Sequence, residues 1–286
     1  MADIRPLNFG EILDAALTIY RRHFGLFLKL AVVSLSIPAL LFVYVAARFM
    51  GSVMTQTPNF QGVLLLIPII LLYYVASLVL TAGTVRIISD SYLGRTPRLH
   101  DALALGVSKI GSLLAVGIGK GIILFLVMAA IGIVVAILVA LAKSGGAVAV
   151  LLIVVACVVG AWLAAFVACG YGVTTPVVVL ETLGSSFDAF GRSWELTRNF
   201  KLKVLGLGLV AVLITNTVPS LVFRALGGAV LPSVPALGMT LTALGYVLPL
   251  ILTPVLAAVI TLMYYDLRVR REAFDLQVLG QQLGII

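Results

Sequence analysis

Hydrophobic residues along the chain gather into six long runs, which are separated alternately by charged and by nearly uncharged segments. The runs cover residues 26–47, 63–85, 111–141, 147–179, 204–229 and 236–265. A helix needs about 20 apolar residues to cross the roughly 30 Å hydrocarbon layer of a membrane, and each run is long enough. The pattern therefore predicts an all-α, polytopic membrane helix bundle of about six transmembrane helices, forming a single membrane domain over residues 1–286.

Five prolines lie within four of these runs. Because proline has no backbone N–H, each is expected to kink its helix, and packing against neighbouring helices makes such kinks tolerable in a bundle. The prolines are Pro38, Pro68, Pro219, Pro249 and Pro254.

The composition supports a membrane environment, because 62% of the residues are hydrophobic and only 10% are charged. Soluble domains carry roughly 25% charged residues. Fifteen Lys and Arg residues lie in the charged segments, whereas Arg48, Lys143 and Arg224 lie on the other side and Lys120 lies inside a run. Cytoplasmic loops are enriched in Lys and Arg, so the charged segments and both termini are predicted to be cytoplasmic. The net charge of +8 is thus explained by topology, and no nucleic-acid partner is expected.

The charged segments resemble one another. Asp14, Asp101 and Asp188 are each followed by alanine, and they lie 87 residues apart. Each Asp-Ala pair opens a helical stretch that leads into two apolar runs. Self-similarity at a fixed spacing indicates internal repeats. We predict three parallel repeats, at about 7–95, 96–184 and 185–280, each entered through a cytoplasmic interfacial helix.

The first of these interfacial helices is the clearest. Between Asn8 and Phe24, apolar residues recur at spacings of three and four, which predicts one apolar helical face, and Asn8 with Glu11 predicts a capping box. Basic residues at such an interface gain roughly 1 kcal/mol each from anionic lipid. The candidate anionic-lipid contacts are Arg21, Arg22, Lys109, Arg198, Lys201, Lys203, Arg268, Arg270 and Arg271.

Local signals also predict details of the other charged segments. Thr96-Pro97 predicts the start of the second interfacial helix, as a cap followed by proline at the first helical position. Residues four apart on a helix can pair, which predicts ion pairs between Asp188 and Arg192, Arg268 and Glu272, and Arg271 and Asp275. The last two pairs would continue the final helix beyond its apolar run.

Three segments carry a resemblance to a known family. They are Gly10-Glu11-Ile12-Leu13-Asp14-Ala15 with Tyr20-Arg21-Arg22-His23-Phe24, Val179-Leu180-Glu181 with Arg192-Ser193-Trp194-Glu195-Leu196-Thr197-Arg198, and Tyr264-Tyr265-Asp266-Leu267-Arg268-Val269-Arg270-Arg271-Glu272 with Phe274-Asp275-Leu276. Together they resemble the bacterial membrane domain named after glycerophosphoryl diester phosphodiesterases. The resemblance implies a multi-pass protein of the bacterial cytoplasmic (inner) membrane with an unassigned role. Because the chain has no room for the phosphodiesterase barrel, we do not expect an enzyme.

Two features are candidates for a polar site. The first is a set of acids near helix starts and span ends, which would either form a polar ring at the cytoplasmic mouth or cap helices and pair with basic residues. They are Asp14, Asp90, Asp101, Glu181, Asp188 and Asp266. The second is Lys120, the one charge deep in a run, which is either functional or a side chain that snorkels to the interface.

The sequence gives little support for catalytic or metal-binding chemistry. His23 and His100, like Cys157 and Cys169, have spacings that fit no metal or catalytic motif, so no cofactor and no metal are expected. The leading hypothesis is a non-enzymatic scaffold that organises membrane lipids or a protein partner at the cytoplasmic face. The alternative is a transporter or lipid-handling channel with a polar site between the spans.

Overall fold

The computed structural model describes residues 5–54, 60–141 and 147–273, and every regular element in these ranges is a helix. Lys143 and Asp275, which enter the charge count and one predicted pair, lie outside the described residues. The helices are α1 (Phe9–Arg22), α2 (Phe24–Met54), α3 (Phe60–Tyr92), α4 (Leu99–Ser108), α5 (Ile110–Leu141), α6 (Ala147–Gly170), α7 (Thr174–Leu180), α8 (Asp188–Thr197), α9 (Lys201–Val212), the π-helix η2 (Leu213–Thr217), α10 (Val218–Val230) and α11 (Pro235–Glu272).

Within the described ranges, six helical segments are long and apolar enough to cross a membrane, and they coincide with the six predicted spans. Their ends differ from the hydrophobic runs. α3 continues seven residues past the predicted end at 85 and takes in Asp90, and α11 continues to Glu272. Helical hydrogen bonding thus carries these helices beyond the apolar stretch that lipid requires.

Two of the predicted spans are interrupted. The fourth breaks at residues 171–173 between α6 and α7, and the fifth contains η2 between α9 and α10. Pro219 is the second residue of α10, just after η2, and its missing N–H leaves the Thr215 carbonyl without its usual partner four residues later. A π-turn is a common way for a helix to absorb such a defect. By contrast, α2, α3 and α11 continue as helices through Pro38, Pro68, Pro249 and Pro254.

Short helices precede the long ones three times, as α1 before α2 and α3, α4 before α5 and α6, and α8 before α9, α10 and α11. That these units are related copies stays a prediction. The capping box of α1 is confirmed, and the Asn8 N–H donates to Glu11 Oε2 over 2.7 Å. The predicted start of α4 at Pro97 is wrong, because the helix begins at Leu99 after an extended Arg98.

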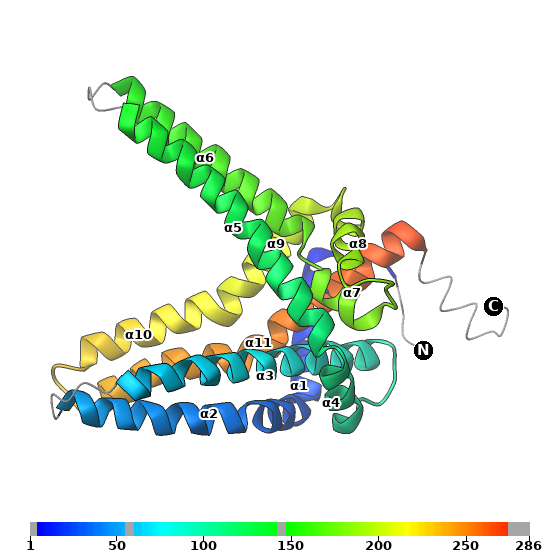
Figure 1. Cartoon of the computed structure of the whole chain (residues 1–286). Helices are drawn as coiled ribbons and strands as arrows, with labels where there is room; N and C mark the ends of the chain where they lie inside the picture. Colours follow the sequence, from blue (N-terminus) through cyan, green and yellow to red (C-terminus); the bar gives the residue numbers. More distant parts are fainter. Residues whose placement is uncertain (1–4, 55–59, 142–146, 274–286) are drawn as a thin grey trace.

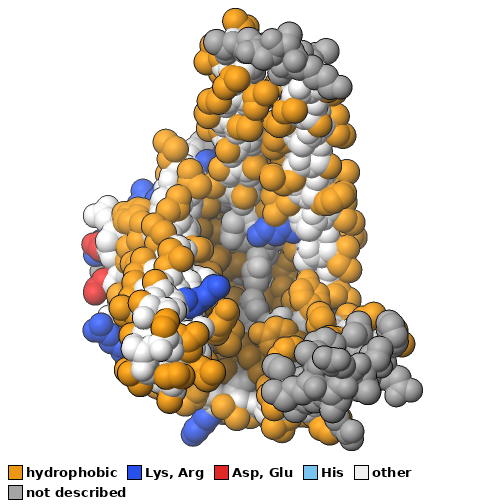
Figure 2. Space-filling view, turned by 90° about the vertical axis from the view of Figure 1, so that its left-hand side faces the viewer, with side chains coloured by type: hydrophobic (Ala, Val, Ile, Leu, Met, Phe, Trp, Pro, Cys, Tyr) orange, Lys and Arg blue, Asp and Glu red, His pale blue; other side chains and the backbone are white. Residues whose placement is uncertain are grey.

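The long helices form a V (Figure 1). α5 and α6 form an antiparallel pair, which is one arm and extends away from the other helices. The other arm contains α2, α3, α10 and α11, which run together. The two arms meet where α1, α4, α7, α8 and the C-terminal part of α11 gather, a region that we call the charged end. Hydrophobic side chains cover most of the face in Figure 2, and a hollow lies between the arms. Side chains facing outward on both arms are therefore largely apolar.

Burial is concentrated at the charged end. Leu262, Tyr264 and Leu267 of α11 are fully buried, and the same cluster includes Ile12 of α1 and Leu196 of α8. In contrast, the most apolar window of α5 has no buried residue. The protein core therefore surrounds the last turns of α11, and the outer parts of the long helices present their apolar side chains outward.

A close approach between α10 and α11 gives a first prediction. A Cβ at Gly227 would lie 2.7 Å from the Thr242 backbone N and 2.8 Å from the Gly238 carbonyl O, whereas a Cβ at Gly228 would have nothing within 4 Å. Backbone atoms cannot rotate away, so Gly227→Ala is expected to destabilise the protein by about 1–3 kcal/mol. Gly228→Ala should be neutral or slightly stabilising, because alanine favours helix. Unfolding of both variants by SDS in mixed micelles, followed by circular dichroism, would measure the difference, and equal stabilities would contradict the packing argument.

Candidate functional site

At the charged end, α11 is connected to other helices by three of its consecutive residues, Tyr264, Tyr265 and Asp266. Tyr265 shares a 2.7 Å hydrogen bond with the Ser89 hydroxyl of α3. Tyr264 donates to Glu181 at the end of α7, and Asp266 bonds to Lys203 of α9. Successive residues of a helix point in different directions, so this short segment contacts three separate parts of the bundle.

The Asp266 network consists of Asp266, Lys203, Arg270 and the backbone of Leu7. The Asp266 side chain is fully buried, and its carboxylate lies 2.6 Å from Lys203 Nζ and 2.9 Å from Arg270 Nε. It also accepts the Leu7 N–H over 2.8 Å, while Lys203 and Arg270 donate to the Leu7 carbonyl over 2.8 and 3.0 Å. Every charge in this network has a partner, which is the condition for burying ions. The network fastens the segment before α1 to α9 and α11.

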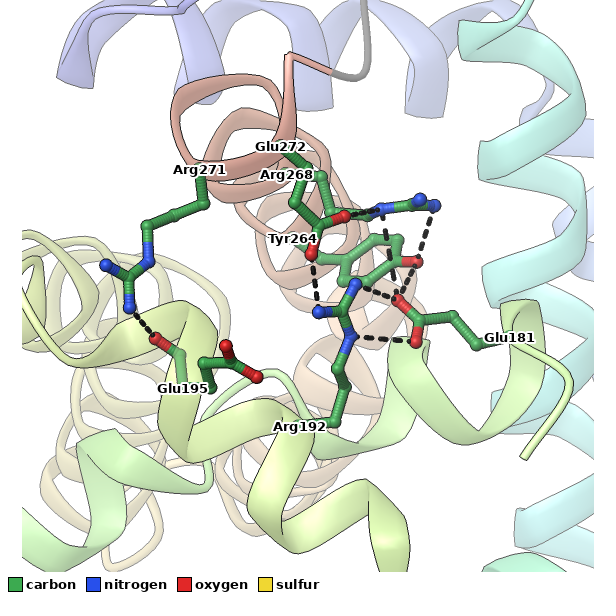
Figure 3. Close-up of polar contacts among 7 residues, drawn as sticks. All are labelled: Glu181, Arg192, Glu195, Tyr264, Arg268, Arg271 and Glu272. Atoms are coloured by element: carbon green, nitrogen blue, oxygen red, sulfur yellow. Dashed lines mark hydrogen bonds and ion pairs between the residues drawn. The ribbon is translucent and has the colours of Figure 1, made fainter. Parts of the chain in front are cut away.

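The Glu181 network joins α7, α8 and α11 (Figure 3). Glu181 accepts from Arg192 Nε over 3.0 Å and from the Tyr264 hydroxyl over 2.8 Å. Arg192 also pairs with Glu272, and Arg268 Nε lies 3.0 Å from Glu272. Burial lowers the pKa of Arg192, but its hydrogen bonds with Glu272 and Glu181 outweigh that effect and hold the pKa above its usual value.

These contacts test the ion pairs that the sequence predicts between residues four apart on one helix. The Arg268–Glu272 pair is confirmed. The Asp188–Arg192 pair is wrong, because Arg192 reaches Glu181 and Glu272, and Asp188 instead accepts the Ser185 N–H over 2.8 Å at the start of α8. The carboxylates of other helices outcompete the neighbour four residues away, since Arg192 makes two hydrogen bonds to Glu181 at once.

The other predicted acids lie apart from these networks. Asp90 is buried and lies 2.9 Å from Arg86 of the same helix. Asp101 lies in the first turn of α4, half exposed beside His100, and Asp14 is exposed on α1. Apart from Asp14, the predicted acids therefore occupy helix starts and separate ion pairs, and among the described residues no group of three could hold a metal ion.

Lys120 is a residue of α5, and its side chain reaches the end of α6. Its Nζ is 3.4 Å from the Tyr171 carbonyl O, just after the last residue of α6. The neighbouring Gly170 carbonyl accepts from the Ser193 and Thr197 hydroxyls over 2.8 and 3.3 Å. The end of a helix leaves carbonyls without partners and carries partial negative charge, so an ammonium group is stabilised there. The structure thus gives Lys120 an acceptor within the protein.

The predicted lipid contacts differ in how far the protein engages their charged groups. Lys203, Arg268 and Arg270 are engaged in the two networks, and Lys201 Nζ is enclosed 3.1 Å from the centre of the Phe166 ring and 3.6 Å from that of Trp194. A headgroup contact does not fit the enclosed Lys201 or the paired Lys203. Lys109 is half-buried. The side chains that remain exposed are Arg21, Arg22, Arg198 and Arg271, of which Arg271 donates to the Glu195 carbonyl.

A cavity of about 400 Å³ lies between α2, α3 and α11. It extends on α3 from Tyr73 to Val85 and on α11 from Val247 to Ile260, and α7 contributes Thr175 and Pro176. Its other lining residues are Tyr20, Phe24, Phe27, Leu28, Ala31, Leu35, Ser77, Leu80, Thr81, Thr84, Leu250, Ile251, Thr253, Pro254, Leu256 and Ala257. This volume is within the range of ligand sites, roughly 300–1,000 Å³.

The wall of the cavity is largely apolar, and four of its hydroxyl groups are bonded within the protein. Ser77 donates to the Tyr74 carbonyl, Thr81 to that of Ser77 and Thr253 to that of Pro249. Tyr20 donates to the Ile251 carbonyl over 3.1 Å. These four hydroxyl groups donate their protons to backbone carbonyls of the protein, and no Lys, Arg, Asp or Glu lines the described part of the wall. Such a surface suits a hydrocarbon chain better than a polar substrate.

Sequence reasoning did not identify this cavity. Its lining comes from α1, α2, α3, α7 and α11, and the hydroxyl residues look like ordinary helix positions in the sequence. One signal was present, since Pro249 and Pro254 interrupt the hydrogen bonding of α11 beside the cavity. Nothing in the spacing of the residues shows which helices face one another across the gap.

Comparison of the chain with models of protein families, with curated proteins and with solved structures finds no match. The class of protein therefore rests on the fold. The described part of the chain has six helical segments long and apolar enough to cross a membrane, with apolar side chains facing outward along both arms, which makes this a multi-pass membrane protein.

Proposed function

We propose that this protein is a non-enzymatic membrane bundle that binds lipid, holding a hydrocarbon chain in the cavity between α2, α3 and α11. The observation that carries the proposal is the apolar wall of that cavity, in which the hydroxyl protons of Ser77, Thr81 and Thr253 are bonded to their own helices. A bound acyl chain would bury its surface against side chains of five helices. The bundle would then organise lipids within the membrane, as a scaffold does.

The length of the cavity supports an acyl chain as the ligand. Twelve residues separate Tyr73 from Val85 on α3. At 1.5 Å per residue these positions span about 18 Å. One leaflet of a roughly 30 Å hydrocarbon layer is about 15 Å deep. A chain lying along α3 would therefore extend through about one leaflet.

We place the charged end in the cytoplasm of a bacterium and the cavity in the cytoplasmic leaflet. The support is the excess of Lys and Arg in the segments that form this end. The resemblance to the membrane domain named after glycerophosphoryl diester phosphodiesterases agrees with this placement. A transporter with a polar site between the spans remains the second hypothesis, and the apolar wall gives it no support.

Filling the cavity tests the proposal. Ala31 and Ala257 both line it, so Ala31→Phe and Ala257→Phe place rings in the space that the chain would occupy. We expect the purified variants to retain about tenfold less phospholipid than the unmodified protein after delipidation, equivalent to about 1.4 kcal/mol. Native mass spectrometry of the detergent-solubilised protein would count the bound lipids.

The matched control is Ala130→Phe. Ala130 is exposed on α5, outside the cavity, so the same substitution there should leave lipid retention unchanged. Retention that falls equally in all three variants, or that stays intact when both cavity positions carry phenylalanine, would argue against a lipid site in the cavity.

A further inference from the structure

We infer that the lipid held in this cavity is an anionic phospholipid, with its phosphate bound by Arg21 and Arg22 at the end of α1. The inference rests on the proposed function and adds the chemical class of the ligand. It follows from the position of the arginine pair beside the cavity and from the contrast between this pair and the basic residues of the two networks.

Tyr20 links the arginine pair to the cavity. Its hydroxyl donates to the Ile251 carbonyl of α11, and its ring contacts those of Phe24 and Phe27, with centroids 5.5 and 6.1 Å away. All three aromatic rings line the cavity at the end nearest α1. Arg21 and Arg22 lie between the lining residues Tyr20 and Phe24 along the chain, so their backbone lies near this end of the cavity.

The next residue fixes the direction of the chain after the pair. His23 Nε2 lies 3.1 Å from the Ser91 hydroxyl near the end of α3, and α2 begins at Phe24. Arg21 and Arg22 thus lie between two anchored aromatic side chains, Tyr20 and His23. Both arginine side chains are exposed. Lys29, one residue after the lining residue Leu28, is also exposed and adds a third positive charge to this side of α2.

Among the described residues, the charges of this pair are not neutralised by a carboxylate. Arg86, Arg192, Lys203 and Arg270 each have a carboxylate partner within ion-pair distance. Across the part of the chain that the structure describes, no carboxylate forms an ion pair with Arg21 or Arg22.

The partial negative charge at the end of α1 favours basic residues there, but it leaves their guanidinium donors available. A guanidinium group binds phosphate through two parallel hydrogen bonds, and a lipid phosphate lies at the depth of an interfacial helix. The lipid phosphate would thus sit at α1 while its chain enters past Tyr20 and Phe24.

The test is competition between two lipids with identical chains. Delipidated protein receives equal amounts of phosphatidylglycerol and phosphatidylcholine, and native mass spectrometry measures the ratio bound. We expect phosphatidylglycerol to be preferred, and we expect Arg21→Gln with Arg22→Gln to reduce that preference roughly fivefold for each arginine removed. The total lipid bound should change much less, because the chain keeps its cavity. Free glycerol phosphate, added in excess, should not displace the lipid.

The control is Arg98→Gln with Arg198→Gln, which removes the same charge from exposed positions that do not adjoin the cavity. An equal loss of preference in the control pair would overturn the inference, because it would show a general attraction of the basic surface. An unchanged preference in the Arg21 and Arg22 variant would overturn it as well. Unmodified protein that retains no lipid would instead contradict the proposed function, whereas retention without preference would contradict only the choice of headgroup.

Discussion

Replacing Asp266 with alanine is expected to cost about 3–5 kcal/mol of folding free energy, enough to remove much of the stability of a typical domain. The side chain is fully buried, and its loss leaves the Lys203 ammonium, the Arg270 guanidinium and the Leu7 N–H without their main acceptor. An isolated buried charge is far more costly than a buried pair. Reversible unfolding by SDS in mixed micelles, followed by circular dichroism, would measure the loss.

Two further variants separate the contribution of the carboxylate from that of its surroundings. Asp14→Ala removes an exposed acid from α1 and should change stability by no more than about 0.5 kcal/mol. Lys203→Met in the Asp266→Ala background removes one orphaned cation, so it should recover part of the loss. An Asp266→Ala protein as stable as the unmodified chain would show that the network does not hold the charged end together.

The same residue illustrates how far the sequence alone leads. Hydropathy was sufficient to predict six spans, because lipid demands long apolar segments whatever their neighbours are. It also indicated that Asp266 ends a span beside basic residues. It did not indicate that Lys203, 63 residues earlier, and the Leu7 backbone, 259 residues earlier, would meet this carboxylate. Long-range pairing depends on how helices pack, and a single sequence carries no direct signal for it.

Local rules succeeded where no competitor was close. The capping box at Asn8 and the Arg268–Glu272 pair both formed within one helix. The rule failed for Arg192, which lies where α7 and α11 each bring a carboxylate. The predicted start of α4 failed for a local reason, since Arg98 is extended and the Arg95 N–H donates to the carbonyl of Asp90, five residues earlier. Tertiary contacts therefore override the spacing rule at Arg192, whereas the local backbone sets the start of α4.

Replacing Glu181 with glutamine is expected to destabilise the junction of α7, α8 and α11 by about 2–3 kcal/mol. The carboxylate accepts from Arg192 and Tyr264, and it also lies 3.9 Å from Arg268 Nε. Without its charge, Arg192 and Arg268 would share Glu272 as their acid. The expected loss is smaller than for Asp266, because about 15% of the Glu181 side chain is accessible to solvent.

A double-mutant cycle tests this explanation. Glu181→Gln, Arg192→Gln and the double variant should show a coupling energy of about 1–3 kcal/mol, which is typical of residues in one polar network. Glu195 provides the matched control, since it is an exposed acid three residues after Arg192 on the same helix and only its backbone carbonyl meets Arg271. Glu195→Gln should leave stability within about 0.5 kcal/mol and show no coupling to Arg192. A coupling near zero for Glu181 and Arg192 would mean that apolar packing around Tyr264 holds the three helices together, with the ion pairs contributing little.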